Sequence, residues 1–404
     1  MDDIRGNGGN ALKDREGNVT WVTVGGPAFP EAALAGLQDL RHVGYLDLCD
    51  MELTDVGLAY LRGLPRVKVL RMSHAKVTAK GLKYVGALKT LGELELSGSS
   101  VDDAGLAQLA GLVNLTDLNL GGCPVGDAGM RHLRGMQKLR YLALCATKVG
   151  DAGAADLAAL TALEGLTLGV NATEAATRDL GRLRRLKSLR LPAGIGDAGL
   201  AQLRGLSNLE SLEELKGVTD KGVQHLAGML KLEGLSLRNC SITDEGLKVI
   251  GRLKSLRDLD LSDLPITDTG LEYLRGMPQL QSLDLSDTRV TDAGMKHLRT
   301  LSVISLLGLS NTHVTDKGLA EIAYLSNLDG LWLDDTAVTD AGVAKLKPLK
   351  KLARLGLGGT KISDRAIQPL VELGGLAWVR VTKTRMTDAG YWELRRRRPG
   401  LATY

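Results

Sequence analysis

One 24-residue pattern returns along almost the whole 404-residue chain. The segment ITDTGLEYLRGMPQLQSLDLSDTRV shows its parts: a Thr-Asp pair, a Gly-Leu step, evenly spaced leucines and a short Leu-x-Leu element. Such a period is typical of repeat proteins, in which each unit buries its apolar face against its neighbours. A repeated coil can therefore extend to this length without dividing into separate globular cores.

Alignment on the acidic residue of the Thr-Asp pair gives sixteen units. The aligned positions are Glu31, Asp55, Ala79, Asp103, Asp127, Asp151, Glu174, Asp197, Asp220, Asp244, Asp268, Asp292, Asp316, Asp340, Asp364 and Asp388. Hydrophobic residues make up 44% of the chain but aromatic residues only 3%, with a single Phe. The interior of each unit is therefore expected to be aliphatic and built mainly from leucine.

Each unit is predicted to contain one strand and one short helix. The Leu-x-Leu element alternates apolar and polar residues, which indicates a strand with one buried face. The Thr-Asp pair supplies side-chain oxygens that can cap backbone N–H groups of the next turn, and leucines spaced by three then indicate a short helix. Stacked units give an α/β fold with a parallel sheet on the concave face and short helices on the convex face.

The units resemble the leucine-rich-repeat superfamily. They are most similar to the cysteine-containing "TDxGL" type of F-box leucine-rich proteins and to the regular arrays of planctomycete-type bacterial proteins. The resemblance covers about residues 19 to 404 and implies a right-handed solenoid curved like a horseshoe. Only about 20 residues precede the repeats, too few for an F-box, so an adaptor role of that kind is not expected.

A single solenoid domain with three parts is predicted. Residues 1–27 form an N-terminal cap with the entry strand GNVTWVTVGG, residues 28–390 form the array, and residues 391–404 form the closing unit. The array is irregular within 151–220, where three successive spacings shorten to 23 residues and Glu214 stands where a buried leucine belongs. We expect a bulge that exposes Glu214. The irregularity is either a tolerated deletion that alters the curvature or a functional kink.

Residues that flank each Leu-x-Leu element should face the concave side, because strand side chains alternate between two faces. Acidic residues then form two patches there, and the late units combine Trp with Arg, two residue types enriched in binding hot spots. We expect room around Trp332 and Trp378, because Gly330, Gly356 and Gly358 lie near them and have no side chains. The alternative is that each Trp packs on a neighbouring long side chain or on the terminal coil. The predicted partner-binding residues are Tyr45, Glu93, Glu95, Asp258, Asp260, Asp284, Trp332, Asp334, Arg354, Trp378 and Arg380.

Other signals are weaker. His132, His225 and His297 share one helical position but lie several repeats apart, so a solvated helix face is expected rather than a metal site. The basic run from Arg395 to Arg398 could contact acidic partners or phosphates, yet basic residues also suit the end of a helix. The GLGLGGT segment superficially suggests a phosphate loop, but its glycines fall in register with the strands.

Catalysis, cofactors and metals are not expected. The chain contains no G-x-S-x-G, H-E-x-x-H or P-loop motif. The four cysteines, Cys49, Cys123, Cys145 and Cys240, are predicted to be reduced thiols, because most pairs lie four or more repeats apart. Reduced thiols and the polar start of the chain favour a cytoplasmic location.

The leading functional hypothesis is a non-enzymatic module that recognises a protein or peptide with its concave face. The alternative is an assembly scaffold that self-associates through its edges or convex helices. A net charge of +4 gives no general electrostatic attraction to nucleic acid, and the acidic inner patches oppose it. No apolar run reaches the length of a membrane span, so no membrane partner is expected.

Overall fold

The computed structural model describes residues 6–169, 171–190, 196–213 and 215–404. They belong to two compact units, residues 1–193 and residues 194–404. Each unit is a coil in which one strand and one short helix alternate.

The first unit begins with a hairpin and continues as a regular coil. Its strands are β1 (Asn10–Lys13), β2 (Val19–Thr23), β3 (Tyr45–Asp47), β4 (Val69–Arg71), β5 (Glu93–Glu95), β6 (Asp117–Asn119), β7 (Tyr141–Ala143), β8 (Gly165–Thr167) and β9 (Ser188–Arg190). Its helices are η1 (Glu31–Leu37), α2 (Asp55–Leu58), η2 (Ala59–Leu61), α3 (Ala79–Val85), α4 (Asp103–Leu109), α5 (Asp127–Met130), η3 (Arg131–Leu133), α6 (Asp151–Leu157) and α7 (Glu174–Leu180), where η marks 3₁₀ geometry.

The second unit repeats the coil. Its strands are β10 (Ser211–Glu213), β11 (Gly234–Ser236), β12 (Asp258–Asp260), β13 (Ser282–Asp284), β14 (Leu306–Gly308), β15 (Gly330–Trp332), β16 (Arg354–Gly356), β17 (Trp378–Arg380) and β18 (Ala402–Thr403). Its helices are α8 (Asp197–Leu203), α9 (Asp220–Val223), η4 (Gln224–Gly228), α10 (Asp244–Ile250), α11 (Asp268–Leu274), α12 (Asp292–Leu298), α13 (Asp316–Ile322), α14 (Asp340–Lys345), η5 (Asp364–Ala366), α15 (Ile367–Glu372) and α16 (Asp388–Arg397).

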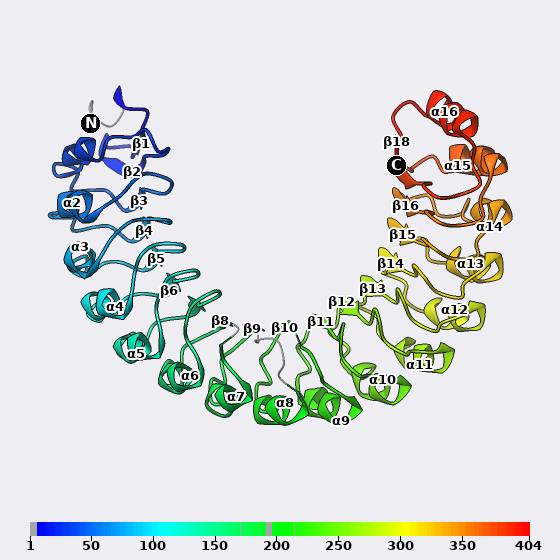
Figure 1. The fold of residues 1–404 in the computed structure, drawn as a ribbon, viewed down its shortest axis with the longest axis horizontal. Helices are drawn as coiled ribbons and strands as arrows, with labels where there is room; N and C mark the ends of the chain where they lie inside the picture. Colours follow the sequence, from blue (N-terminus) through cyan, green and yellow to red (C-terminus); the bar gives the residue numbers. More distant parts are fainter. Residues whose placement is uncertain (1–5, 170, 191–195, 214) are drawn as a thin grey trace. The chain divides into compact units, whose positions relative to one another are not determined.

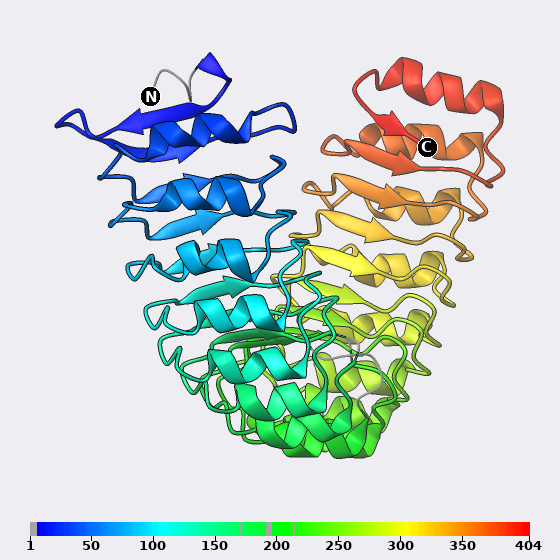
Figure 2. The same cartoon turned by 60° about the vertical axis from the view of Figure 1, so that its left-hand side comes forward.

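Within each unit the strands form one side of the coil and the helices the other. Strands β2 to β9 pair in parallel, as do β10 to β18, and like positions of successive repeats face each other. In each unit the strands lie on the inner side of the curve and the helices on the outer side (Figure 1). Figure 2 shows the same two layers from another direction. The predicted α/β coil of parallel strands and short helices is thus confirmed.

The entry strand has a partner that the repeat pattern does not reveal. Strand β1 pairs antiparallel with β2, with Ala11 opposite Val22. Both side chains are buried. The hairpin therefore covers the first edge of the sheet, which would otherwise expose unpaired backbone groups.

The core of each unit is aliphatic, as the composition predicts. Leu283 in β13 pairs with Leu259 and Leu307 of the adjacent strands, and all three side chains are buried. Leu271 and Leu274 of helix α11 are also fully buried. Stacked leucine layers fill the space between the strands and the helices, so the core lengthens with each repeat.

The Thr-Asp pair makes two kinds of hydrogen bond at each helix start. Oγ of Thr291 accepts a hydrogen bond from the backbone N–H of Ala293 (3.2 Å), so Thr291 caps its own helix α12. The carboxylate of Asp268, one repeat earlier, accepts from the backbone N–H and the hydroxyl of Thr291, at 2.8 and 2.6 Å. The aspartate therefore connects its repeat to the next one.

This connection recurs along both units as an aspartate ladder. Hydrogen bonds from Thr173 lower the pKa of Asp151 below its ordinary value, which is the shift that a carboxylate accepting two such bonds should have. The ladder pairs with both hydrogen bonds are Asp55–Thr78, Asp151–Thr173, Asp197–Thr219, Asp220–Thr243, Asp244–Thr267, Asp268–Thr291, Asp292–Thr315, Asp316–Thr339, Asp340–Ser363 and Asp364–Thr387.

The glycine of the T-D-x-G motif makes space for this ladder. A Cβ atom on Gly294 would collide with Oδ1 of Asp268 and would lie 2.8 Å from Cδ1 of Leu271. Gly294 has ordinary helical backbone angles. Glycine is therefore required at this position by the close packing between repeats rather than by the backbone conformation. The same approach to the preceding aspartate occurs at Gly270 and Gly318.

The predicted bulge at Glu214 lies outside the described residues. Leu212 and Leu215 are both buried on either side of it. The four cysteines are free thiols, as predicted. Burial raises the pKa of Cys123, which favours its protonated and unreactive form.

Within the described ranges, no helix combines the length and apolar character needed to cross a membrane.

Candidate functional site

Two rows of solvent-facing side chains cross the strands of each unit. The middle residue of a typical strand is buried and its two neighbours are at least partly exposed, as in β5 and β12. In the first unit one row contains Trp21, Tyr45, Val69, Glu93, Asp117, Tyr141, Gly165 and Ser188, and the other Thr23, Asp47, Arg71, Glu95, Asn119, Ala143, Thr167 and Arg190. In the second unit they include Gly234, Asp258, Ser282, Leu306, Gly330, Arg354 and Trp378, and Ser236, Asp260, Asp284, Gly308, Trp332, Gly356 and Arg380.

The first unit has a hollow of about 460 Å³ over strands β5 to β8. We call it the early hollow. Its floor is the sheet at strand positions whose leucine side chains are buried in the core, and its walls are polar and aromatic side chains of the two rows. The lining residues are Glu93, Leu94, Glu95, Asp117, Leu118, Asn119, Tyr141, Leu142, Ala143, Gly165, Leu166, Thr167 and Ser188. The first predicted acidic patch thus lies in a concavity rather than on a flat surface.

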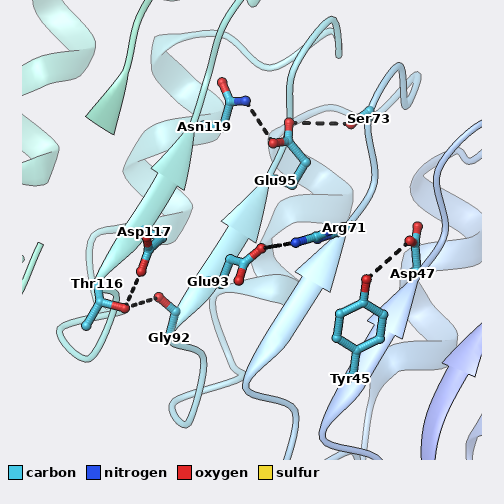
Figure 3. A network of polar contacts seen from close by, with 10 residues as sticks. All are labelled: Tyr45, Asp47, Arg71, Ser73, Gly92, Glu93, Glu95, Thr116, Asp117 and Asn119. Atoms are coloured by element: carbon cyan, nitrogen blue, oxygen red, sulfur yellow. Dashed lines mark hydrogen bonds and ion pairs between the residues drawn. The ribbon is translucent and has the colours of Figure 1, made fainter. Parts of the chain in front are cut away.

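Polar contacts hold the carboxylates of the early hollow in place (Figure 3). Arg71 donates to Oε1 of Glu93 through Nε and Nη2, at 3.1 and 2.7 Å. Oε2 of Glu95 accepts from Nδ2 of Asn119 (2.8 Å), and Oε1 accepts from the backbone N–H of Ser97 (2.7 Å). Both acidic side chains are therefore positioned by neighbouring repeats and loops.

Asp117 completes the acidic side of the early hollow. Its Oδ2 accepts a hydrogen bond from the hydroxyl of Thr116 (2.6 Å), and Thr116 is bonded in turn to the carbonyl of Gly92 (3.0 Å). This chain of contacts, drawn in Figure 3, fixes Asp117 beside Glu93 in the same row.

Aromatic rings stand at both ends of this acidic segment. Tyr141 is 43% exposed and lies against Gly165, where a Cβ atom would approach the ring to 2.7 Å. On the other side, the rings of Trp21 and Tyr45 stack with centroids 3.3 Å apart, and Arg71 lies 5.6 Å from the Tyr45 ring. Trp21 was not among the predicted site residues, although its place 24 residues before Tyr45 puts it in the same row.

The second acidic patch also lies in a hollow, in the second unit. This hollow, here the middle hollow, has a volume of about 660 Å³. Asp260 is held by the hydroxyls of Ser236 (2.9 Å) and Ser262 (2.6 Å), whereas the carboxylate of Asp258 makes no hydrogen bond or ion pair with a described residue. The lining residues are Glu210, Ser211, Glu233, Gly234, Leu235, Ser236, Asp258, Leu259, Asp260, Ser282 and Asp284.

The late tryptophans occupy different rows of the sheet. Trp332 is the last residue of β15 and lies opposite Gly356, whereas Trp378 is the first residue of β17 and lies opposite Arg354. The ring of Trp332 extends over Gly330, where a Cβ atom would lie 2.6 Å from its edge. Gly330 and Gly356 thus leave room for this ring, whereas Gly358 lies against Asp334 and Arg380. Both tryptophans are half-buried.

The contacts of Trp332 and Trp378 agree in part with the alternative that each tryptophan packs on a neighbouring side chain or on the terminal segment. Trp378 lies 6.0 Å from the ring of Tyr404 in the terminal segment and 5.5 Å from the guanidinium of Arg380. Arg354 forms an ion pair with Asp329 and lies 6.0 Å from the Trp332 ring. These residues are therefore neighbours, with each tryptophan supported by an arginine.

The exposure predicted for Asp334 is wrong. Asp334 is only 8% exposed, and its Oδ1 accepts a hydrogen bond from the backbone N–H of Gly358 (2.8 Å). Arg380 lies 3.6 Å from the same oxygen. The carboxylate of Asp334 occupies the space left by the missing side chains of Gly356 and Gly358, so these neighbours cover it and Asp334 supports the next loop.

The weaker sequence signals have structural roles. Arg396 pairs with Glu393 (2.8 Å), and Arg398 donates to four backbone carbonyls of the preceding repeat. His132, His225 and His297 are all half-buried on their helices, and Nδ1 of His297 is enclosed without a hydrogen-bonding partner among the described residues. Burial and the nearby Lys296 lower the pKa of His297.

Four segments of the chain, residues 112–133, 229–251, 252–274 and 277–298, match a family model described as Leucine Rich repeat. No curated protein matches the chain.

Solved structures with a similar fold cover most of the chain. An internalin from Listeria monocytogenes is 23% identical with a TM-score of 0.63, over 80% of this chain and 88% of that one. A Leptospira interrogans leucine-rich-repeat protein is 17% identical with a TM-score of 0.62, over 92% and 97%. The ectodomain of the Arabidopsis receptor kinase HAESA, solved with a peptide hormone ligand, is 16% identical with a TM-score of 0.54, over 93% and 76%. These similarities concern the fold.

Proposed function

The chain is a leucine-rich-repeat protein, and on this basis we propose that it is a non-enzymatic module that binds a protein or peptide on its strand rows. Proteins of this fold are commonly protein-binding modules. The HAESA ectodomain, which shares the fold, was solved in complex with a peptide hormone. A comparable role for this chain has to be supported by its own surface.

The observation that carries the proposal is the composition of the strand rows. Aromatic residues are only 3% of the chain, yet Trp21, Tyr45, Tyr141, Trp332 and Trp378 all stand in these rows. Trp, Tyr and Arg are enriched in interface hot spots because they bury large areas at small entropic cost and still offer polar edges.

The rows also form a rigid template. Side chains recur at the strand spacing of about 4.8 Å and are held by backbone pairing on both sides. A surface that is already ordered loses little conformational entropy when a partner docks. Carboxylates crowd both hollows and would repel phosphates, so we propose a protein or peptide partner rather than nucleic acid or a membrane surface.

Partner capture with a double variant tests the late part of the rows. The intact chain and Trp332→Ala/Trp378→Ala are immobilised, and proteins bound from a lysate of the source organism are identified by mass spectrometry. We expect a partner captured by the intact chain to bind the double variant at least tenfold more weakly, since one hot-spot truncation costs about 2 kcal/mol or more.

A matched control comes from the closing helix. Trp392 is 63% exposed but belongs to α16 rather than to a strand row, so Trp392→Ala should leave partner affinity within twofold. Equal capture by the intact chain and by the Trp332→Ala/Trp378→Ala variant would remove these two residues from the proposed surface.

Self-association is the second candidate function. Large apolar side chains are exposed at both ends of the chain, with Leu12 in the first hairpin and Trp392 and Tyr404 in the closing segment. Such patches favour contacts between copies. Sedimentation velocity over a range of concentrations separates the two functions, because a scaffold forms larger species that Trp392→Ala reduces, whereas a recognition module stays monomeric without its partner.

We also propose that the chain works in the cytoplasm. The support is that all four cysteines are free thiols, which suits a reducing compartment. Alkylation of intact cells followed by mass spectrometry should find Cys49 and Cys145 unoxidised, and oxidised thiols at both sites would oppose this location.

A further inference from the structure

We propose that the early hollow binds an arginine side chain of an extended basic segment in the partner. This inference rests on the proposed function, because it names the chemistry of what docks on the rows of the first unit. It follows from the charge of the hollow, its acceptor atoms, its aromatic wall and its size.

The charge of the early hollow has one sign. Its lining includes the carboxylates of Glu93, Glu95 and Asp117 and no lysine or arginine, so its formal charge is −3. The whole chain carries +4. Negative charge is therefore concentrated in this concavity. Two arginines lie near it: Arg71 pairs with Glu93, and Arg140, whose guanidinium is 5.4 Å from the Tyr141 ring, pairs with Glu164 outside the lining. A cationic partner group is the complement to such a surface.

The carboxylates are held in position yet keep acceptor capacity. Arg71 holds Oε1 of Glu93, and Thr116 holds Oδ2 of Asp117. The second oxygen of each group makes no hydrogen bond with a described residue. A guanidinium group offers five N–H donors in a planar fork, so it can bond to acceptors from two strands at once. These fixed acceptors need little reorganisation to receive it.

Tyr141 adds an aromatic surface beside the acceptors. It follows Asp117 in the same row, and the missing side chain of Gly165 allows its ring to lie along the sheet. Arginine stacks on aromatic faces more readily than lysine, because its planar group is more weakly hydrated. An aromatic face next to carboxylates therefore favours arginine among the basic residues.

The hollow is large enough for one long side chain together with part of an extended backbone. Its volume of about 460 Å³ lies within the range of ordinary ligand pockets, roughly 300–1,000 Å³. The ring of Tyr141 and the methyl group of Ala143, both in the lining, give the aliphatic stem of arginine an apolar surface. The occupant is thus a basic segment rather than a free metal ion, for which the described residues offer no group of three ligands.

Photocrosslinking with defined peptides tests this inference on the full chain. The probe is a Gly/Ser peptide with three arginines at alternate positions and a benzophenone next to the central one. Matched probes carry glutamine or glutamate in place of arginine. The labelled residues are identified by mass spectrometry. We expect the arginine probe to label strands β5 to β8, and the glutamine and glutamate probes to label them at a tenth of that yield or less.

Charge-neutral variants locate the effect. In Glu93→Gln/Glu95→Gln/Asp117→Asn, labelling of β5 to β8 by the arginine probe should fall at least tenfold, and in Tyr141→Ala about threefold. The matched control is Glu16→Gln/Asp39→Asn/Glu52→Gln, which removes three carboxylates outside the hollow and should change the yield less than twofold. Circular dichroism checks that each variant is folded.

The inference is overturned if the first triple variant is labelled as strongly as the intact chain. It is also overturned if the neutral or acidic probe labels β5 to β8 equally, or if those strands crosslink only to a second copy of the chain. The proposed function fails by a different result, namely retention of a captured protein partner after the strand rows have been altered.

Discussion

Changing Leu283 to alanine is expected to destabilise the second unit by about 2–5 kcal/mol. Leu283 is 1% exposed and lies between Leu259 and Leu307 of the neighbouring strands. Its removal leaves a cavity in a stack of leucines that cannot collapse without shifting two paired strands. Denaturant unfolding measures the loss, and hydrogen exchange should show faster exchange of amides in β12 to β14.

The control for Leu283→Ala is its neighbour in the same strand. Ser282 faces solvent at the edge of the middle hollow, so Ser282→Ala should change the unfolding free energy by less than about 0.5 kcal/mol. Repeats contact only their neighbours, and the faster exchange should therefore remain local. Equal effects of the two changes would contradict the assignment of the buried and exposed faces.

The second large effect is expected from Gly294→Ala. The new methyl group would collide with Oδ1 of Asp268 and crowd Leu271, so we expect a loss of about 1–3 kcal/mol from overpacking. In an ordinary helix interior, the same exchange would stabilise by up to about 1 kcal/mol. The sign of the change therefore reports the close contact between repeats, and denaturant unfolding measures it.

A double-mutant cycle separates this contact from other effects. Asp268→Ala alone removes two hydrogen bonds from Thr291 and should cost about 1–3 kcal/mol. In that background the carboxylate is gone, so Gly294→Ala should cost at least about 1 kcal/mol less than in the intact chain. Strict additivity of the two changes would contradict the account of the T-D-x-G motif.

Much of the fold could be predicted because each repeat follows local rules. The alternation around Leu283 predicts a strand with one buried face, and Thr291 before a helix predicts a cap. The partner of Asp268 could not be predicted, because Thr291 lies 23 residues away and their contact depends on how successive coils stack. The repeat pattern also could not predict strand β1 of the first hairpin, since a single short strand has no repeated copy that would reveal it.

The candidate site could be predicted less completely than the fold. The period of 24 residues placed Glu93 and Asp117 in one row, but it could not show that the surface is hollow between them and Ser188. That depth comes from small side chains such as Ala143 and Gly165, whose effect depends on the neighbouring rings. The burial of Asp334 could not be predicted, because the alternation of a strand gives the face of a residue but not whether neighbouring strands and loops cover it.

The most direct test of the strand rows as the docking surface is crosslinking from the chain itself. A photoreactive residue is placed either at Ala143, in a row of β7, or at Thr269, an exposed position on helix α11. Each chain is then irradiated with the captured partner. We expect crosslinks to the partner from position 143 and at most a tenth of that yield from position 269. The reverse pattern, or equal yields, would contradict the claim that the partner binds the strand side.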